Sequence, residues 1–365
     1  MQITAKLTGI EYKSYLNKKL EVIEYNDLDI NQAPASFSVK EKSFLFNISK
    51  WVSPKRTRSY PFERVYNTLN GNKKITVIPV VKDEGIKGDR DFIQWDTISL
   101  MSLLDVYVIL CFYDKAIKHP RKEGKVTSQK FNNQFIKDKI KDISNYHSSS
   151  LHWNLKEIIN TLPIVINKVI ASYKTISKDI GIDFHNSKGI DSFKNKVMLN
   201  ADSFMNTSRA KAIQAQRREY KTIQPKEALA TLTKAKINIE NYLGGIYYFT
   251  VDEIEMKNDE LYLIEAKHSR GSKLPSISDI KDGLLKMILY TNLKTAKIDD
   301  TVYTVKPVLK LTSSSLIGKF NSSLKKKMKG RFCIDNGFTI RQKALLETLI
   351  KECEENQILL RIEEG

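Results

Sequence analysis

Two carboxylates and one amine between residues 246 and 268 have the spacing of a metal-dependent hydrolytic site. Glu265 and Lys267 are two residues apart in a run of strand-forming residues, so they project from the same face of that strand. Asp252 lies thirteen residues before Glu265, in the preceding run. Carboxylate oxygens hold Mg²⁺, and a neighbouring amine can position an attacking water or neutralise charge that develops on a phosphate.

A β-hairpin would bring these groups together. The pattern of β-formers predicts one strand over about 246–256 and a second over about 261–268. Residues 257–260, Lys-Asn-Asp-Glu, are typical of the turn between them. A short turn folds Asp252 back toward Glu265, and the three groups would then converge at one spot.

Nearby polar residues are alternative or additional candidates. Glu253 and Glu255 compete for the role of the first carboxylate; Glu253 points to the opposite face, but a bulge would exchange the two faces. Glu240 could orient a second metal or a ligand, or be a solvated helix glutamate. Lys286 and Tyr290, four residues apart on a predicted helix, could meet a phosphate or serve packing and surface charge.

The flanking segments predict helices on both sides of the hairpin. A helix is expected over about 226–243, ended by Gly244-Gly245 as a C-cap signal. A second helix is expected over about 277–291, followed by a strand over 305–311.

The pattern Asp252 … Glu265-Ala266-Lys267 resembles the PD-(D/E)xK nuclease superfamily, which includes many restriction endonucleases. In that family an aspartate on one strand precedes a hydrophobic-Glu-x-Lys segment on the next, and Ile264-Glu265-Ala266-Lys267 matches that segment. Val251 stands where the family name has proline. The resemblance covers about residues 225–315, where the order of helix, hairpin, helix and strand is also similar.

The resemblance implies a restriction-endonuclease-like α/β core, with a mixed central sheet flanked by helices. It also implies that Asp252 and Glu265, with the carbonyl of Ala266, hold Mg²⁺, that Lys267 steadies the nucleophile, and that Glu240 is an additional acidic residue of the site. The expected activity is Mg²⁺-dependent, sequence-specific cleavage of double-stranded DNA, as in a type II restriction endonuclease, leaving 5′-phosphate and 3′-hydroxyl ends.

Composition and charge agree with a nucleic-acid partner. The 365 residues include 60 Lys and Arg against 42 Asp and Glu, a net charge of +18 that draws the protein to polyanions. Three scattered cysteines offer neither a disulfide framework nor a metal spacing, so we expect a reducing, cytoplasmic compartment. No apolar run is long enough to span a membrane. The sequence contains no P-loop signature, so we expect no ATP as a partner.

Two basic segments are the candidate DNA contacts. Lys55, Arg56 and Arg58 lie in a Pro-punctuated stretch with interleaved aromatic residues, which suits a phosphate backbone. Arg217 and Arg218 lie on a helix expected over 208–220. Because cutting both strands with one site per chain calls for two-fold symmetry, we expect a homodimer.

The organisation expected along the chain has four parts. Residues 1–95 are strand-rich and a candidate DNA-contacting region, 96–202 are helical, 203–315 form the catalytic core, and 316–365 are a helical extension. Within the helical region, 98–116 reads as a buried helix. Two other functions remain open: a different nuclease of the same fold, acting in repair, mobile elements or defence, and a nucleic-acid-binding protein without catalysis.

Overall fold

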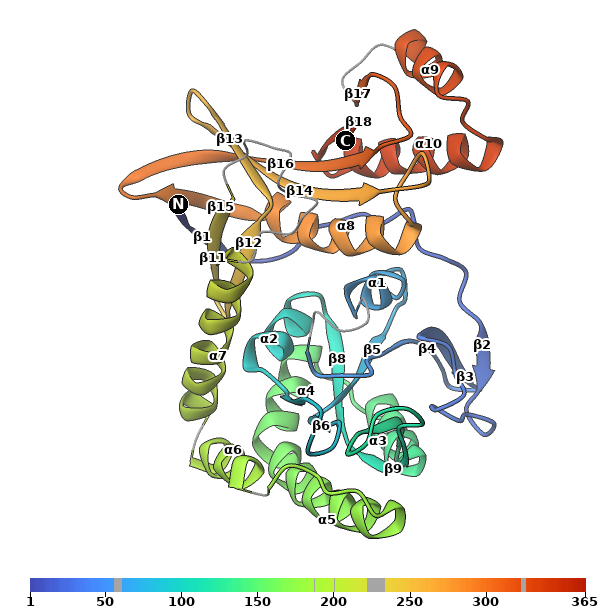
Figure 1. The fold of residues 1–365 in the computed structure, drawn as a ribbon, viewed down its shortest axis with the longest axis vertical. Coiled ribbons are helices and arrows are strands. Elements are labelled where there is room, and N and C mark those ends of the chain that lie inside the picture. The colour runs from blue at the N-terminus through green and yellow to red at the C-terminus, as the bar shows by residue number, and fades with distance from the viewer. Residues whose placement is uncertain (56–60, 187, 200, 222–233, 323–325) are drawn as a thin grey trace. The chain divides into compact units, whose positions relative to one another are not determined.

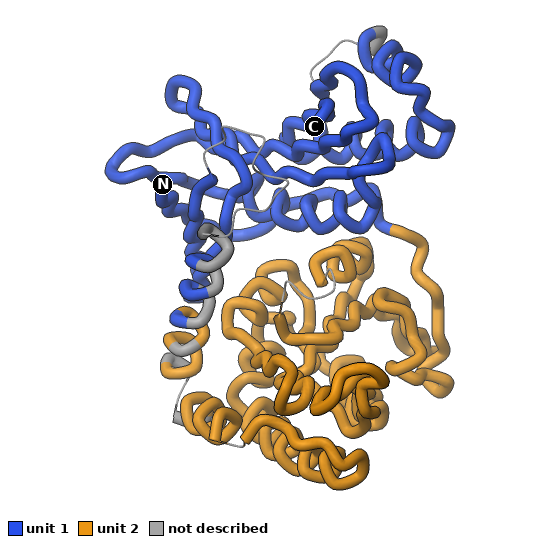
Figure 2. The backbone as a smooth tube through the Cα atoms, in the orientation of Figure 1, with its two compact units in different colours: residues 1–17, 210–365 blue, residues 18–209 orange. Residues whose placement is uncertain are grey.

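The protein is organised as two compact units (Figure 2). Unit 1 comprises residues 1–17 and 210–365, and unit 2 comprises residues 18–209. The computed structural model describes residues 1–55, 61–186, 188–199, 201–221, 234–322 and 326–365. Unit 1 is therefore built from both ends of the chain, and unit 2 is an insertion into it.

Unit 1 contains a mixed β-sheet flanked by helices (Figure 1). Its strands are β1 (Gln2–Leu7), β11 (Ala235–Asn241), β12 (Ile246–Val251), β13 (Glu253–Lys257), β14 (Glu260–Ser269), β15 (Leu293–Ile298), β16 (Thr301–Ser313), β17 (Lys319–Asn321) and β18 (Leu359–Glu364). Its helices are α8 (Ile277–Thr291), α9 (Lys326–Asp335) and α10 (Ile340–Glu355). The strands follow the order β12-β11-β1-β15-β16-β14-β13, with β18 beside β16 and β17 beside β18.

The two ends of that strand order are consecutive in the chain. β12 runs antiparallel to β11, with Val251 opposite Ala235, whereas β13 runs antiparallel to β14, with Glu253 opposite Ile264. Asp252 alone separates β12 from β13. The strand therefore changes partner at Asp252, and an interruption of this kind leaves a side chain and its neighbouring backbone outside the regular ladder.

Helix α8 makes the crossover between strands β14 and β16, which are parallel. The side chain of Ser276 caps the helix by accepting a hydrogen bond from the amide of Asp279. Buried residues at helical spacing, among them Ile280, Leu284 and Ile288, form its apolar face. The helix packs against both strands of the crossover, so its polar residues beside this face can reach side chains of β14.

Unit 2 has a five-stranded sheet in the order β2-β3-β4-β5-β8, two two-stranded sheets (β6 with β7, and β9 with β10) and several helices. Its strands are β2 (Val22–Glu24), β3 (Ser36–Glu41), β4 (Phe44–Lys50), β5 (Lys74–Pro79), β6 (Val81–Asp83), β7 (Arg90–Phe92), β8 (Val106–Cys111), β9 (Tyr113–Lys118) and β10 (Val126–Phe131). Its helices are α1 (Pro61–Tyr66), α2 (Trp95–Leu103), α3 (Asn133–Ser144), α4 (Ser150–Lys156), the π-helical turn η1 (Glu157–Thr161), α5 (Leu162–Ile180) and α6 (Lys188–Leu199). Helix α7 (Ala201–Lys221) contains residues of both units.

The prediction of a helix over 226–243 is wrong for residues 234–243, which are the part of this range that the structure describes. Residues 222–233 lie outside the described residues, and β11 follows from Ala235. In β11 buried residues alternate with more exposed ones, which is the period of a strand and not of a helix. Gly244 has a φ of 73° in the turn to β12, so it shapes a hairpin and does not end a helix.

Two expectations for unit 2 are also corrected. The segment 98–116 is not one buried helix: α2 ends at Leu103, and β8 and β9 follow. All six residues of β8 are buried, and an apolar run buried on both faces fits either a strand or a buried helix. Residues 96–202 are therefore not helical throughout, because β8, β9 and β10 lie between α2 and α3. Strand β1 belongs to unit 1, whereas most of 1–95 belongs to unit 2.

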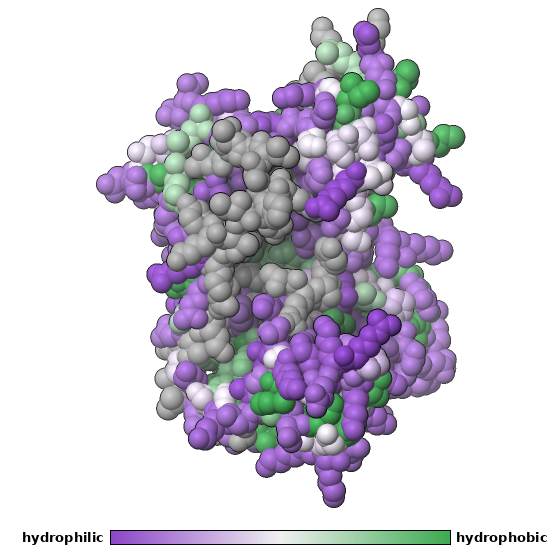
Figure 3. Space-filling model, in the orientation of Figure 1, coloured by the Kyte–Doolittle hydropathy of each residue, from purple (hydrophilic) through white to green (hydrophobic). Residues whose placement is uncertain are grey.

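Hydrophilic residues cover most of the described surface on the face drawn in Figure 3, and hydrophobic residues appear there as scattered patches. Within the described parts of the chain, none of the helices combines the length and the apolar character that a membrane crossing needs.

Candidate active site

Asp252 is bound to the backbone of β14 at the point where the ladder between β13 and β14 ends. Its Oδ2 atom accepts a hydrogen bond of 3.0 Å from the amide of Ala266. The pairing of β14 with β13 stops at Ile264. Beyond this point the Ala266 amide donates to the side chain of Asp252 and not to a backbone carbonyl of β13. The amide and carbonyl of one strand residue point to the same side, so the carbonyl of Ala266 faces the same edge as Asp252.

Four charged side chains of alternating sign line up beside Asp252. The carboxylate of Glu265, with 1% of its side chain exposed, contacts Lys267 Nζ at 3.0 Å and Lys286 Nζ at 2.9 Å. Lys267 Nζ also lies 3.0 Å from Asp282 Oδ2. Strand β14 supplies Glu265 and Lys267, and helix α8 supplies Asp282 and Lys286. We call these four residues together with Asp252 the acidic–basic cluster.

The ionisation of the cluster reflects its burial. Burial raises the pKa of Asp252 to about 7, and the nearby charge of Glu265 adds to this, against the opposing effect of Lys286. Burial also acts to raise the pKa of Glu265, but Lys286 and Lys267 hold it below its ordinary value. Burial acts to lower the pKa of Lys267, but Glu265 and Asp282 raise it above its ordinary value. The site thus holds two neighbouring carboxylates that repel each other.

The competing carboxylates of β13 are engaged elsewhere. Glu253 forms an ion pair with Lys310 at 3.0 Å, and Glu255 makes a two-pronged contact with the guanidinium of Arg361. The structure therefore brings Asp252, and neither glutamate, to the side of Glu265 and Lys267.

Glu240 does not belong to this cluster. It is exposed on β11, opposite Lys6 and Ile246 in the strand register. The end of β11 near Asp252 is Ala235, and five residues of strand separate the two positions by about 17 Å. The expected role of Glu240 depended on a helix that is not there.

The two residues of α8 that were candidates for contact with a phosphate have different surroundings in the structure. Lys286 joins the cluster through Glu265, whereas Tyr290 is buried. Asp282 was not predicted, although it lies four residues before Lys286 and hence on the same helix face. That spacing was the signal available in the sequence.

The candidate DNA contacts are described only in part. Lys55 is exposed at the surface of unit 2, with its Nζ 3.9 Å from Asp91. Arg217 is exposed on α7. Arg56 and Arg58 lie outside the described residues, as does the side chain of Arg218.

The donor set suits a hard divalent cation with few protein ligands. Among the described residues no cluster contains three or more His, Cys, Asp or Glu side chains placed for a metal. Asp252 and Glu265 provide two carboxylates, the Ala266 carbonyl faces them, and Mg²⁺ commonly takes one or two carboxylates and completes its shell with water and phosphate oxygens. Glu265 raises the pKa of Asp252, and a cation beside the two carboxylates would offset that repulsion.

Comparisons of the chain with protein-family models, with curated proteins and with solved structures found no match. The site is therefore interpreted from its own chemistry.

Proposed function

We propose that the protein is a Mg²⁺-dependent endodeoxyribonuclease whose active site is the acidic–basic cluster. The observation that carries this proposal is the convergence of Asp252, Glu265 and Lys267 at the break between β12 and β13. The net charge of +18 supports a polyanionic substrate. Four strands, β11 to β14, lie between α7 and α8, and β12 and β13 are separated by Asp252 alone. Strands β15 and β16 follow α8, and we take this order as support for a restriction-endonuclease-like core.

In the proposed reaction, Asp252, Glu265 and the Ala266 carbonyl would hold Mg²⁺. A cation held there supplies Lewis-acid chemistry, because it makes water easier to deprotonate and offsets negative charge on the phosphoryl group. Lys267 donates from its ammonium to the attacking water or to a phosphoryl oxygen in the transition state. Water adds to phosphorus as one of its protons passes to bulk water, the bond from phosphorus to the 3′-oxygen breaks, and that oxygen takes a proton from bulk water, which gives a 5′-phosphate and a 3′-hydroxyl.

The two helix residues have supporting roles in this scheme. When Glu265 turns toward a cation, Lys267 keeps Asp282 as its partner, so its ammonium stays in place. Lys286 balances the buried charge of Glu265 when no cation is bound. The alternation of charges thus keeps the site ordered both with and without the metal.

The finer proposal is a type II restriction endonuclease that cuts a specific duplex sequence as a homodimer. A chain without a P-loop signature has no motor of its own, and its large second unit provides surface for reading DNA. If each chain has one active site, cutting both strands of a DNA duplex calls for two chains related by two-fold symmetry.

The test of the activity is cleavage of supercoiled plasmid with Mg²⁺, compared with the same digestion in EDTA. Asp252→Ala with Glu265→Ala should abolish cutting, whereas electrophoretic mobility shifts of DNA should be largely retained. Asp279→Ala removes a half-buried carboxylate of the same helix that is bonded to Ser276 and lies outside the cluster, so this matched control should cut normally. Full cutting by the double variant would refute the site, and binding without any cutting by the wild type would favour a non-catalytic DNA-binding protein.

The digestion products decide the subclass. Discrete bands with uniform ends after end mapping indicate a restriction endonuclease. A smear of products indicates another nuclease of repair, mobile-element or defence type, which would share the same site.

A further inference from the structure

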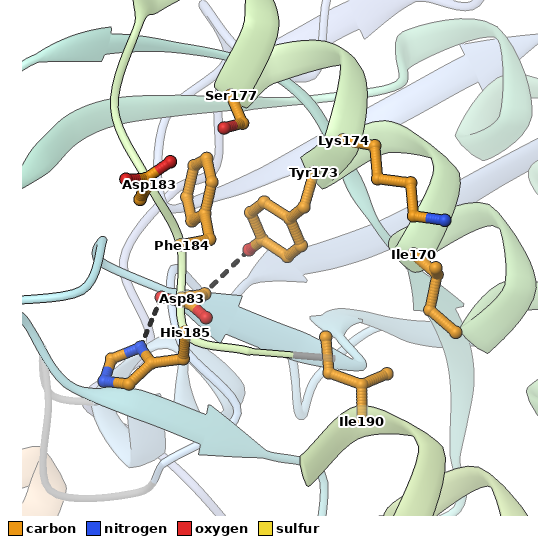
Figure 4. Close-up of a pocket in the computed structure, with 9 residues that line it drawn as sticks. All are labelled: Asp83, Ile170, Tyr173, Lys174, Ser177, Asp183, Phe184, His185 and Ile190. Atoms are coloured by element: carbon orange, nitrogen blue, oxygen red, sulfur yellow. Dashed lines mark hydrogen bonds and ion pairs between the residues drawn. The ribbon is translucent and has the colours of Figure 1, made fainter. Parts of the chain in front are cut away.

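Unit 2 contains a pocket that the proposed reaction does not use. It has a volume of about 310 Å³, within the range of sites for small organic ligands. Helix α5 provides Ile170 and Tyr173, the segment after α5 provides Phe184, and the end of β6 provides Asp83 (Figure 4). All of these residues belong to unit 2.

The base of the pocket holds a buried carboxylate whose two oxygens differ in their partners. Asp83 Oδ1 accepts hydrogen bonds from the Gly85 amide at 3.0 Å and from His185 Nδ1 at 2.8 Å. Asp83 Oδ2 has no hydrogen-bond partner among the described residues, and the guanidinium of Arg90 lies 3.9 Å away. Figure 4 shows this second oxygen on the side of the carboxylate away from His185. A buried acceptor in this state calls for a donor, which water or a ligand can supply.

The walls of the pocket favour a flat aromatic ligand. The rings of Tyr173 and Phe184 lie 4.7 Å apart between centroids and are tilted by 45°. Ile170 and Ile190 add apolar surface to the same pocket. Asp83 is itself held in place, because its amide donates to the hydroxyl of Tyr173 at 3.0 Å. The acceptor and the ring walls are therefore fixed relative to each other before a ligand binds.

Lys174 and Asp183 also line the pocket, and Figure 4 shows them on opposite sides of the Tyr173 ring. On the Lys174 side an ammonium or guanidinium ligand would meet a like charge. A neutral N–H donor avoids that repulsion, and an anionic group on the same ligand would be attracted to Lys174. A nucleotide combines these properties: a flat ring, an exocyclic amine and a phosphate.

We propose that this pocket binds an amino-bearing nucleobase, adenine or cytosine, with the exocyclic amine donating to Asp83 Oδ2 and the ring beside Tyr173 and Phe184. Acceptance of the cytosine amine by Asp or Glu is a known mode of base readout. The base could come from a free nucleotide or from a nucleotide extruded from DNA, because both present the same chemistry. The inference concerns binding and does not depend on cleavage.

The test uses matched nucleotide pairs with the wild-type chain in EDTA, by isothermal titration calorimetry. AMP and IMP, and likewise CMP and UMP, differ in whether an amine or a carbonyl occupies the tested position. We expect one amino member to bind at least about tenfold more tightly than its oxo counterpart, since a carbonyl would face an acceptor. Asp83→Asn should lose or invert this preference, because an amide can donate to a carbonyl.

A second pair of variants covers the case in which Asp83→Asn does not fold. Ile170→Trp fills the pocket from α5 and should abolish binding of the preferred nucleotide, whereas Ile164→Trp, at an exposed position on the same helix, should not. Equal affinity for amino and oxo members, absence of binding at about 1 mM, or tighter binding of butylamine than of either amino nucleotide would each overturn the proposal.

The source of the base is assigned with a duplex that contains 2-aminopurine, whose fluorescence rises when it leaves the base stack. A rise that the Ile170→Trp variant fails to produce indicates an extruded base. Preference for AMP or CMP without such a rise indicates a free nucleotide. Because these measurements are made without Mg²⁺, they are independent of whether the acidic–basic cluster cleaves DNA.

Discussion

Lys267 Nζ lies 3.0 Å from Asp282 Oδ2, and this contact joins strand β14 to helix α8 beside the candidate active site. Glu265 is the other partner of the same ammonium, also at 3.0 Å. If Glu265 binds a cation, Asp282 is the partner that remains. Asp282 is therefore expected to position Lys267 during the reaction.

Asp282→Asn should slow plasmid cleavage by about 10- to 100-fold, which corresponds to about 1.4–2.7 kcal/mol of activation free energy. The apparent KM should change little, because the residue acts through Lys267 and not on the DNA. Single-turnover cleavage rates measure the effect. Asp279→Asn, three residues earlier on α8, should cleave at the wild-type rate, and equal rates for both variants would remove the positioning role.

The pKa of Asp252 predicts a pH-dependent gain in stability for Asp252→Asn in EDTA. Its pKa of about 7 in the folded state lies above the ordinary 3.8, so the charged form is disfavoured by folding. The wild type therefore loses stability as pH rises from about 4 to 7. The variant avoids this loss and should be more stable above pH 7 by about 2–4 kcal/mol, and equal to the wild type near pH 4. Urea denaturation at several pH values checks the prediction; a difference independent of pH would contradict it.

Lys286→Met should destabilise unit 1 in EDTA, because the buried carboxylate of Glu265 loses one of its two cationic partners. The expected loss is about 2–4 kcal/mol. Adding Glu265→Gln should recover part of that loss, since the uncompensated charge is then removed. Lys297→Met, an exposed lysine on β15, should change stability by less than about 0.5 kcal/mol. Additive effects in the double variant would show that Lys286 and Glu265 are not coupled.

Gly283 lies on α8 where the stem of Lys267 passes. A Cβ there would lie 3.2 Å from Lys267 Cε and 3.1 Å from Leu309 Cδ1, so Lys267 would have to shift. Gly283→Ala should reduce the rate of cleavage several-fold, because Lys267 would be displaced. It should change stability little, because crowding of the new methyl group offsets the gain in helix propensity.

Gly330 on α9 is the matched position, because a Cβ there meets nothing within 4 Å. Gly330→Ala should raise stability by about 0.5–1 kcal/mol and leave cleavage unchanged. Thermal unfolding and cleavage rates of the two variants, measured side by side, test the comparison. A Gly283→Ala enzyme as active as Gly330→Ala would mean that Lys267 tolerates the added methyl group.

The local elements of the candidate site were predictable because their signals are local. The turn at Asn258, the second hairpin strand and helix α8 follow from turn residues and apolar spacing, and α8 has the predicted bounds. The single strand expected over about 246–256 is instead two strands, because β12 pairs with β11 and β13 pairs with β14. The placement of Asp252 beside Glu265 follows from the hairpin alone.

The parts that were missed depend on distant partners or on ambiguous patterns. Strand β11 was interpreted as a helix, although its alternation of Ala235, Ile237 and Ile239 with polar residues has the period of a strand. The pairing of β1 with both β11 and β15 has no local signal, because any strand of suitable pattern could take that place. Asp282 reaches Lys267 only through the crossover of α8 over the sheet.

Strand β1 between β11 and β15 has a consequence for biosynthesis. Strand β1 is translated long before its neighbours β11 and β15, whereas all of unit 2 is present once residue 209, within α7, has been translated. Unit 2 can thus fold while the sheet of unit 1 is still incomplete. The groups of the candidate active site can assemble only after α8 has been translated, so a truncated chain that ends before α8 carries the inserted unit without the candidate active site.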